Sequence, residues 1–440
     1  MSLRKHAEYK ESGLPLTPIA PSHWSRTALK YLGNYQNGYP FKPEDRGEEG
    51  LPIIRISQLT SDDEPAYFKG ELDQRVKVAT GDLLFSWSAT IDAYIWSRGD
   101  AWLNQHIFKV TESQEASKDF LYYVIKHIAP KLADFDAHGS TMRHIKKESL
   151  GEKLYIPPQQ EQLAIANFLD RETAKIDALI AEQKRLIELL QEKRQAVISH
   201  AVTKGLNANA PMKDSGVEWL GEVPEHWETG KIKHYFRTTS GSTPNSDKPE
   251  LYYTTEEDEH GTPWIRTTDI DNDEVNTAVV FITPKALGDT ACKALPVNTV
   301  LVALYGGGGT VGKNGILKIE AAVNQALCGI LPSPKALPEY VHKYIQFLRP
   351  FWMERAVSSR KAGNISQELV GDTTFPIPPL QEQMAILRAI EEKLKELDEL
   401  AKQSSESLVL LEERRSALIS AAVTGQIDVR GLVEAEAGKQ

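Results

Sequence analysis

Apolar residues recur at helical spacing along two long stretches of the chain, and short apolar runs fill the regions before them. Over residues 159–204 the apolar side chains fall at alternating steps of three and four residues, with no Pro or Gly before Gly205. Residues 380–425 repeat this spacing with more polar interruptions. Such steps are typical of helices that pair along a heptad seam. The pattern therefore predicts two long helices, each spanning roughly 60 Å.

The predicted helix-pairing seam consists of apolar positions on one side of each helix. Its residues are Ile176, Leu179, Leu186, Leu190 and Val197 in the first helix and Leu397, Leu400, Leu411 and Leu418 in the second. Gln183 shares the spacing, whereas Lys193, Ser404, Ser407 and Arg414 interrupt it. Periodicity alone equally fits core helices of a bundle. The matched lengths favour two helices that pair with each other.

The chain contains an internal duplication. Ile-Pro-Pro-Gln-Gln-Glu-Gln at 156–162 recurs as Ile-Pro-Pro-Leu-Gln-Glu-Gln at 377–383, and the shift of 221 residues then holds without a gap to Thr203 and Thr424. Upstream the shift drifts, from 203 at Ser12 and Ser215 to 220 at Asn104 and Asn324. Loops absorb insertions, whereas one extra residue in a paired helix rotates its apolar stripe by about 100°. The drifting parts are therefore predicted to be globular and the ungapped parts helical.

Each globular part predicts a mixed α+β domain of short strands and one or two helices. The strand candidates are Leu51–Ile56, Asp82–Trp87, Ile107–Val110, Pro263–Thr267, Val300–Leu304 and Gly315–Ile319, and the helix candidates are Lys118–Ala133 and Pro338–Arg355. The predicted fold class is α+β, with two mixed domains separated by two long helices in a pseudo-two-fold repeat. The predicted divisions are a first domain at 8–158, a helix at 159–204, a second domain at 205–379, a helix at 380–425 and a tail at 426–440.

Composition places the chain among ordinary globular proteins. Its 440 residues, 41% hydrophobic and 25% charged, exceed what one core usually supports, so two or three domains are expected. Its apolar runs are too short for a membrane span and its polar start lacks a signal-peptide core, so we expect a cytoplasmic protein without membrane contact. Cys292 and Cys328 lack a zinc spacing, and we expect reduced thiols and no metal. The net charge of -10 means that any DNA contact must come from local basic patches.

One glycine-rich segment invites a catalytic interpretation. Residues 305–314 nearly match a phosphate-binding loop, with Gly307, Gly312 and Lys313 in place, but Asn314 stands where a Ser or Thr should ligate magnesium. The equivalent segment in the first half has no glycine run, and no helical pattern follows either copy. We therefore predict a surface turn or a DNA-facing loop rather than a nucleotide site.

Other catalytic motifs are missing from the sequence. An adenine methyltransferase needs an Asn/Asp-Pro-Pro-aromatic motif, yet the Pro-Pro pairs here lie in Ile-Pro-Pro-Gln and Ile-Pro-Pro-Leu. His23 and His226 precede paired tryptophans at equivalent positions, which indicates packing rather than chemistry. We predict no catalytic residue and no cofactor on this chain.

Basic residues near the ends of the globular parts are the DNA-binding candidates. They are Arg55, Arg143, His144, Lys146 and Lys147 in the first half and Arg266, Lys313, Arg360 and Lys361 in the second. The two loops mix cations with Gly and hydroxyl groups, which suits phosphate contact, and the two strand-end arginines could read guanine edges. Solvated loops and internal ion pairs are the plainer alternatives.

The motifs together resemble the specificity (S) subunits of type I restriction-modification enzymes. The resemblance rests on the duplicated Ile-Pro-Pro-x-Gln-Glu-Gln turn, on the helix ending in Arg-x-Ala-hydrophobic-Ile-Ser-x-Ala-Val-Thr, and on Ser-Gly-Val-Glu-Trp-Leu-Gly-Glu-Val-Pro-Glu-His-Trp at 215–227. It covers about residues 8–430. The first copy, at 12–24, diverges from this motif and lacks the Val-Glu-Trp of 217–219.

The resemblance implies a non-catalytic, sequence-specific DNA-binding subunit. Each globular half would be a target-recognition domain that reads one half of a bipartite target in double-stranded DNA, and the helices would form an antiparallel coiled coil that sets the spacing. Two modification (M) subunits carrying S-adenosylmethionine would methylate adenine N6. Restriction (R) subunits using ATP and Mg would cleave unmodified DNA. The rival hypotheses are an enzyme, either an NTPase or a self-contained methyltransferase, and a helical scaffold that binds only proteins.

Overall fold

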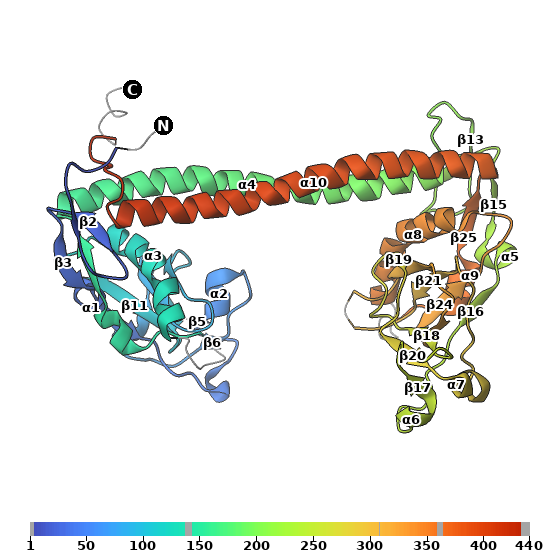
Figure 1. The fold of residues 1–440 in the computed structure, drawn as a ribbon, viewed down its shortest axis with the longest axis horizontal. Helices are drawn as coiled ribbons and strands as arrows, with labels where there is room; N and C mark the ends of the chain where they lie inside the picture. The colour runs from blue at the N-terminus through green and yellow to red at the C-terminus, as the bar shows by residue number, and fades with distance from the viewer. Residues whose placement is uncertain (1–3, 137–142, 308, 359–363, 433–440) are drawn as a thin grey trace. The chain divides into compact units, whose positions relative to one another are not determined.

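The computed structural model describes residues 4–136, 143–307, 309–358 and 364–432. The chain divides into two compact units, one formed by residues 1–184 with 405–440 and the other by residues 185–404 (Figure 1). Each unit therefore contains one globular domain and parts of both long helices. Within the described part of the chain, no helix is long and apolar enough to cross a membrane.

The globular domain of the first unit consists of short strands together with helix α3 and two shorter helices. Its strands are β1 (Tyr9–Glu11), β2 (Ile19–Pro21), β3 (Ser25–Ala28), β4 (Gly33–Asn37), β5 (Leu51–Ile54), β6 (Tyr67–Phe68), β7 (Lys77–Val78), β8 (Leu83–Ser86), β9 (Asp92–Ile95), β10 (Ala101–Leu103), β11 (Ile107–Glu112) and β12 (Lys153–Ile156). Its helices are α1 (Leu29–Leu32), α2 (Ile56–Thr60) and α3 (Lys118–Asp136), with 3-10 turns at Pro43–Asp45, Gln74–Val76 and Lys147–Gly151.

The second unit has a similar composition of elements. Its strands are β13 (Met212–Asp214), β14 (Glu222–Pro224), β15 (Glu228–Lys231), β16 (Thr238–Ser240), β17 (Tyr253–Thr254), β18 (Thr262–Ile265), β19 (Asp273–Val275), β20 (Val280–Ile282), β21 (Val300–Ala303), β22 (Asn314–Leu317), β23 (Ala322–Val323), β24 (Leu327–Ile330) and β25 (Thr374–Ile377). Its helices are α5 (Ile232–Tyr235), α6 (Pro249–Tyr252), α7 (Pro284–Asp289), α8 (Pro338–Ser358) and α9 (Gln367–Asp372). The long helices are α4 (Gln159–Lys204) and α10 (Leu380–Val423).

Both domains contain the same two kinds of sheet. One is antiparallel, with the order β4-β11-β8-β9 in the first domain and β16-β24-β21-β22 in the second, where β19 adds an edge strand. The other contains a parallel pair, β5 with β10 and β18 with β23. The strand and helix candidates from the sequence all correspond to observed elements, and the mixed α+β prediction is confirmed.

Helices α3 and α8 hold each antiparallel sheet against the long helices. In the first unit, Phe120 and Ile128 of α3 share a buried cluster with Phe85 of β8, Leu169 of α4 and Ile419 of α10. Figure 1 shows α3 between the strands and the long helices, and α8 in the same place within its own unit. The core of each domain therefore continues into the long helices.

The positions of α4 and α10 that turn inward follow a heptad, but not the one predicted at every step. In α4 the buried or half-buried positions include Ile176, Ile180, Gln183, Ile187, Leu190 and Val197. In α10 they include Leu394, Leu397, Ala401, Ser404, Leu408, Leu411 and Leu418. The predicted seam residues Leu179, Leu186 and Leu400 are instead 44%, 40% and 49% exposed.

The error has a simple origin in the order of the steps. From Ile176, steps of four then three lead to Ile180 and Gln183, whereas steps of three then four lead to Leu179 and the same Gln183. Neighbouring residues differ by about 100° around a helix, so Ile180 faces inward and Leu179 outward. The positions common to both series are buried or half-buried.

Each unit pairs its parts of the two long helices through one ion pair at repeat-equivalent positions. In the first unit Arg415 Nε of α10 donates to Asp177 Oδ1 of α4 at 2.7 Å. In the second unit Arg194 of α4 pairs with Asp398 of α10. Arg194 and Arg415 are 221 residues apart, as are Asp177 and Asp398. The duplication is therefore visible in contacts as well as in sequence.

The Ile-Pro-Pro-x-Gln-Glu-Gln motif joins each domain to its helix. Glu161 accepts hydrogen bonds from Trp24 Nε1 at 3.1 Å and lies 2.7 Å from His23 Nε2. Glu382 accepts from Trp227 Nε1 at 3.1 Å and lies 2.8 Å from His226 Nε2. The two histidines, which we expected to serve packing alone, therefore also make a polar contact.

The last glutamine of the motif fastens the start of each helix to the loop before α3 or α8. Gln162 Oε1 accepts from Ser117 N at 2.8 Å while its Nε2 donates to Pro157 O at 3.0 Å. Gln383 makes the same two contacts with Leu337 N and Pro378 O, both at 2.8 Å. Because both glutamines are buried, these bonds satisfy backbone groups that water does not reach.

Candidate nucleic-acid interface

The ends of strands β5, β10 and β8 in the first domain bring polar side chains together. Ile54 O, at the end of β5, accepts a hydrogen bond from Asn104 N at 3.0 Å. The Asn104 side chain accepts from His106 N, 3.4 Å away, and so shapes the turn between β10 and β11. Arg55 therefore projects from a strand end that is bonded to the turn carrying Gln105 and His106.

The tryptophan after β8 connects this turn to the basic loop. The Trp87 ring lies 5.3 Å from the His106 ring, and its Nε1 donates to Asn37 Oδ1 at 3.2 Å. Trp87 O accepts from Ile145 N at 2.8 Å. An unbroken series of contacts therefore leads from the strand end at Arg55 to the loop that contains residues 143–147.

The basic candidates in that loop have different surroundings. Arg143 is exposed and forms an ion pair with Asp134 of α3. His144 lies in a short bridge to Ser88 and is half-buried. The side chains of Lys146 and Lys147 are exposed and form none of the ion pairs found among the described residues. The two lysines are thus the cations of this loop best placed for phosphate contact.

The second domain repeats this backbone framework. Asn324 N donates to Ile265 O at 3.0 Å, Leu304 N donates to Ala326 O at 2.8 Å, and Ile365 N donates to Leu304 O at 2.9 Å. These bonds correspond to those of Asn104, Trp87 and Ile145 in the first domain. Arg360 and Lys361, the predicted cations of the equivalent loop, lie outside the described residues.

The two strand-end arginines occupy equivalent positions but are not equally available. Arg266 is held by Asp269, with Nε 3.1 Å from Oδ2 and Nη2 3.0 Å from Oδ1, and this bonding raises the pKa of its guanidinium. Asp269 also accepts from Arg266 N at 2.9 Å. In the first domain Gln58 takes this role, accepting from Arg55 N at 3.1 Å. An amide cannot form an ion pair, so the exposed guanidinium of Arg55 stays accessible.

The glycine-rich segment, described at residues 306–307 and 309–312, lies between two antiparallel strands, β21 and β22. Gly312 N donates to Ala303 O at 2.9 Å and Ala303 N donates to Lys313 O at 2.7 Å. A phosphate-binding loop leads instead into a helix whose N-terminus faces the phosphate. Lys313 Nζ lies 3.1 Å from Asp271 Oδ1, and the buried Asn314 binds Asn272 Oδ1 at 3.2 Å. The segment is therefore a hairpin loop, as expected from the missing helical pattern.

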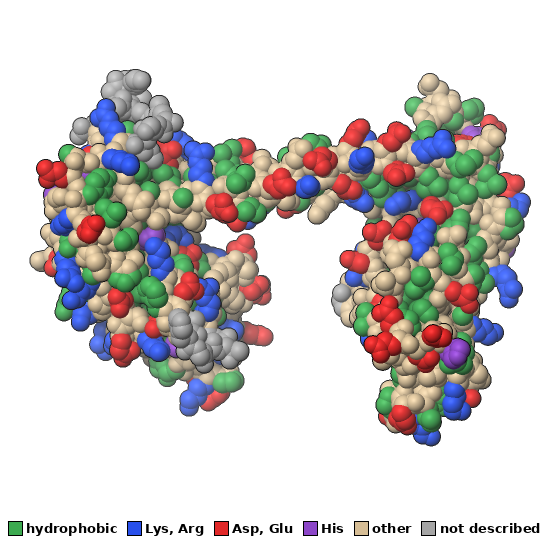
Figure 2. Space-filling view, viewed as in Figure 1, with side chains coloured by type: hydrophobic (Ala, Val, Ile, Leu, Met, Phe, Trp, Pro, Cys, Tyr) green, Lys and Arg blue, Asp and Glu red, His purple; other side chains and the backbone are tan. Residues whose placement is uncertain are grey.

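Charge is mixed over the surface. In Figure 2 basic and acidic side chains alternate over the visible face of each unit, without one large patch of a single sign. This agrees with the net charge of -10 and with the expectation of local basic patches. The acid-paired arginines, Arg143 and Arg266, show how these patches are partly neutralised within the chain.

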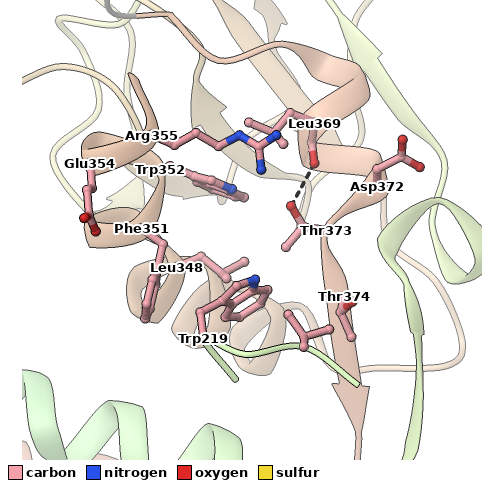
Figure 3. Close-up of a pocket in the computed structure, with 11 residues that line it drawn as sticks. Trp219, Leu348, Phe351, Trp352, Glu354, Arg355, Leu369, Asp372, Thr373 and Thr374 are labelled. Atoms are coloured by element: carbon pink, nitrogen blue, oxygen red, sulfur yellow. Dashed lines mark hydrogen bonds between the residues drawn. The ribbon is translucent and has the colours of Figure 1, made fainter. Parts of the chain in front are cut away.

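An open pocket of about 560 Å³ lies beside α8 in the second domain, lined by both apolar and polar side chains (Figure 3). Trp219 packs on one wall, with its ring 5.4 Å from that of Phe351 and 6.2 Å from that of Phe347. On the opposite side, Thr373 Oγ1 donates to Leu369 O at 2.7 Å. The Val-Glu-Trp segment at 217–219 therefore packs against α8, which explains a motif that the first copy lacks.

Sequence reasoning singled out the strand-end arginines but missed the surrounding polar side chains. Asn104-Gln105 and Asn324-Gln325 were noticed only as markers of the repeat. An Asn that returns with the same neighbour in both copies could have indicated a repeated turn. The contribution of Trp87 and His106 carried no such signal, because the second half has Leu304 and Ala326 in their places.

The family model described as "Type I restriction modification DNA specificity domain" matches residues 21–189 and again residues 224–409. The chain belongs to this family. Members of the family recognise DNA, and the catalytic activities lie in other subunits, so the enzyme hypothesis does not apply to this chain. The predicted resemblance to specificity subunits is confirmed.

Individual relatives agree with the family match. The chain is 24% identical over 430 residues to the type I restriction enzyme EcoBI specificity subunit of Escherichia coli, covering 93% of this chain and 88% of the relative. It is 23% identical over 447 residues to the MjaVIII specificity subunit of Methanocaldococcus jannaschii, covering 98% and 99%. A solved chain from a study of complex assembly and conformational transition of the type I R-M system matches with a TM-score of 0.64 at 15% identity, covering 92% and 98%. That likeness supports the fold.

Proposed function

We propose that this specificity subunit reads a bipartite target in double-stranded DNA, one half with each globular domain. The observation that carries the proposal is the repetition of one strand-end framework in both domains, with Arg55 and Arg266 at equivalent positions. Two readers of the same construction suit two separated DNA segments, as in dimeric DNA-binding proteins. Different side chains on one framework, such as His106 and Ala326, would give the two halves different sequences.

Within the first domain, we assign Arg55 to base contact and Lys146 and Lys147 to phosphate contact. Arg forms the commonest specific contact with guanine, through two parallel hydrogen bonds, whereas Lys neutralises phosphates without reading sequence. In the second domain Lys313, Arg360 and Lys361 are the phosphate candidates. Arg266 would have to exchange Asp269 for a base, so we assign it a lesser contribution.

We further propose that α4 and α10 form an antiparallel coiled coil that sets the distance between the two recognition domains. The equivalent ion pairs Asp177–Arg415 and Arg194–Asp398 support this pairing, as does the heptad of inward positions. Apolar side chains outside the seam, such as Val409 and Leu410, are 55% and 64% exposed. Exposed apolar groups on a helix pair suit contact with protein partners.

The partners in this proposal are two modification subunits and the restriction subunits of a cytoplasmic complex. S-adenosylmethionine, ATP and Mg would be bound by those partners. Partner subunits that enclose the duplex would supply phosphate contacts, which compensates for the acidic balance of this chain. This chain would direct those partners to the target, where the modification subunits would methylate adenine N6 and the restriction subunits would cleave unmodified DNA.

The proposal is tested by sequencing N6-methyladenine in cells that express this chain with its modification subunit. We expect a two-part motif with a fixed gap, absent when the modification subunit is expressed alone. Arg55→Ala should weaken or relax one half of the motif only, because one bidentate base contact contributes about 1–3 kcal/mol of discrimination. Arg75→Ala is the matched control, since this exposed arginine of the same domain is held by Asp73.

Two results would contradict the proposal. One is the same motif with and without this chain, which would favour the scaffold hypothesis. The other is an equal loss at both halves in Arg55→Ala, which would mean that the residue supports the assembly rather than reads DNA.

A further inference from the structure

Three side chains from distant parts of the sequence meet at the start of α4. His6 precedes β1, His23 lies between β2 and β3, and Glu161 belongs to the first turn of α4. One ligand atom of each lies within 4.8 Å of the other two. His23 Nε2 is 2.7 Å from Glu161 Oε2, and His6 Nε2 is 3.7 Å from Glu161 Oε1.

His6 is the unusual member of this cluster. Its side chain is 2% exposed, and within the part of the chain that the structure describes its Nε2 has no hydrogen-bond partner, although it faces a carboxylate. A buried polar atom without a partner is unfavourable, because burial has removed its hydrogen bonds to water. The His6 Nε2 atom therefore lies beside a carboxylate without bonding to it, in a position to act as a ligand.

We propose that His6, His23 and Glu161 bind a divalent transition metal ion, and that zinc fits best. Two imidazoles and one carboxylate are a common zinc ligand set, with a fourth position left for water. Tetrahedral ligand atoms about 2.0–2.1 Å from zinc lie roughly 3.3 Å apart. The separation of 2.7 Å between His23 Nε2 and Glu161 Oε2 is shorter than that value, and one ligand atom of each residue lies within 4.8 Å of the others, so side-chain rotations would bring all three to the ion.

Neighbouring groups would orient the ligands. Trp24 Nε1 donates to Glu161 Oε1 at 3.1 Å, which leaves Oε2 for the metal. A metal on His6 Nε2 places the ring proton on Nδ1, which lies 3.8 Å from Asp428 Oδ2. Arg430 Nη2, 3.3 Å from the same Nδ1, would turn toward Asp428, which it already binds at 2.7 Å. Carboxylates behind a ligating histidine typically strengthen metal binding 10–100-fold.

The second half of the chain provides an internal control. His226 and Glu382 repeat the contact of His23 and Glu161 at 2.8 Å. The position equivalent to His6 is Asn209, counted from the paired strands β1 and β13, and its side chain is exposed. The second half therefore has two of the three ligands, and we expect it not to bind zinc tightly.

A bound ion would fasten both ends of the described chain to the first domain. His6 belongs to the N-terminal segment, and Asp428 behind it belongs to the segment after α10. Arg4 O already accepts from Asp428 N at 2.8 Å. The metal would thus stabilise the first unit, in which α10 ends beside Trp24.

The test is zinc titration of the full-length chain, purified without a histidine tag, against a chromophoric chelator. We expect one tight site in the wild-type chain, a loss of at least tenfold in affinity in His6→Asn, and a 10–100-fold loss in Asp428→Asn. His226→Asn is the matched control and should keep the wild-type affinity. Cobalt in place of zinc should give the visible absorption bands of a tetrahedral site in the wild type and not in His6→Asn.

Two outcomes would overturn the proposal. One is wild-type zinc affinity no higher than that of the His6→Asn/His23→Asn double variant. The other is equal loss in His226→Asn and His6→Asn. Circular dichroism of each variant shows whether it is folded, so a loss of binding through unfolding is distinguishable from a loss of ligands.

Discussion

His342 of α8 lies in the core of the second domain, 5% exposed, and its Nε2 has no hydrogen-bond partner among the described residues. Burial lowers its pKa from 6.5 to about 3, and the nearby Lys343 adds to this effect. Below pH 6.5 the unfolded chain therefore takes up a proton that the folded protein does not. The stability of the second domain should be constant above about pH 7 and should fall as the pH drops toward 3.

We predict that His342→Leu removes much of this pH dependence. At pH 5 the wild type should lose about 2 kcal/mol through this group, and the variant should not. The measurement is the free energy of unfolding from urea titrations at pH 7.5 and pH 5. Some dependence should remain, because burial also lowers the pKa of His127 in the first domain to about 4. His234→Leu, an exposed histidine of the second domain, should keep the wild-type profile, and a pH slope unchanged by His342→Leu would contradict the prediction.

The candidate residues show how far single positions can be predicted from sequence. Arg55 and Arg266 were found because the repeat aligns them. Their difference depends on Gln58 and Asp269, which the drifting loops hide from a comparison of the halves. Glu161 belongs to the duplicated Ile-Pro-Pro-x-Gln-Glu-Gln motif. Its contacts with His6 and His23 could not be predicted, because only the fold brings these chain segments together.

At the scale of elements, the seam of α4 provides a sharp comparison between neighbours. Ile180 faces inward, whereas Leu179 is 44% exposed. We predict that Ile180→Asn lowers the free energy of unfolding by about 2–4 kcal/mol, because it buries an amide and removes apolar contact. Leu179→Asn should cost less than about 1 kcal/mol. Chemical denaturation of both variants measures these losses. A larger loss in Leu179→Asn than in Ile180→Asn would instead support the seam predicted from the sequence.

The glutamine that fastens each helix start is a second target. Gln383 is fully buried and bonds Leu337 N and Pro378 O. Gln383→Ala leaves both backbone groups unpaired and should cost about 2–4 kcal/mol in thermal or chemical unfolding. Gln381→Ala, on the exposed side of the same turn, should change stability by less than about 0.5 kcal/mol. Equal effects would mean that the contact with Leu337 contributes little.

The boundaries of helices and strands were predictable where proline, or a long stretch without proline and glycine, determines them. Pro157 and Pro158 end a strand before α4, and the long stretch without Pro or Gly continues as one helix. The seam was predictable only in part, because Leu179 and Ile180 are both apolar and either satisfies a heptad. Burial against a partner decides between them, and that information lies outside the helix itself.

At the scale of the whole molecule, the proposed coiled coil predicts a link between helix length and DNA spacing. Seven residues inserted after Ile187 in α4 and after Ser404 in α10 would add about 10 Å without rotating either seam. Methylation sequencing should then give a motif whose gap is about three base pairs longer. A single residue inserted at each site rotates the stripes by about 100° and should abolish the motif. An unchanged gap in the seven-residue variant would exclude the helices as the spacer.

The domain architecture was the feature most readily predicted from sequence, because the chain is duplicated and its two halves can be aligned with each other. The sheet order was not predicted, since short strands carry no signal of their neighbours. The extra strand β19, which extends the antiparallel sheet of the second domain beyond β22, shows why. An insertion that lengthens a loop in one copy can add a strand without altering the framework around Arg266.

The hydrogen bond between Arg4 O and Asp428 N has a consequence for the order of the chain. Residues 205–211 connect the first repeat to the second by covalent bonds, and this contact brings the end of the second repeat back to the start of the first. In its order of contacts the chain therefore links the two repeats at both junctions, once by covalent bonds and once by this hydrogen bond. If the chain were opened at residues 205–211 and its present ends were joined, the same segments would remain in contact. These contacts therefore do not require the first repeat to precede the second along the chain.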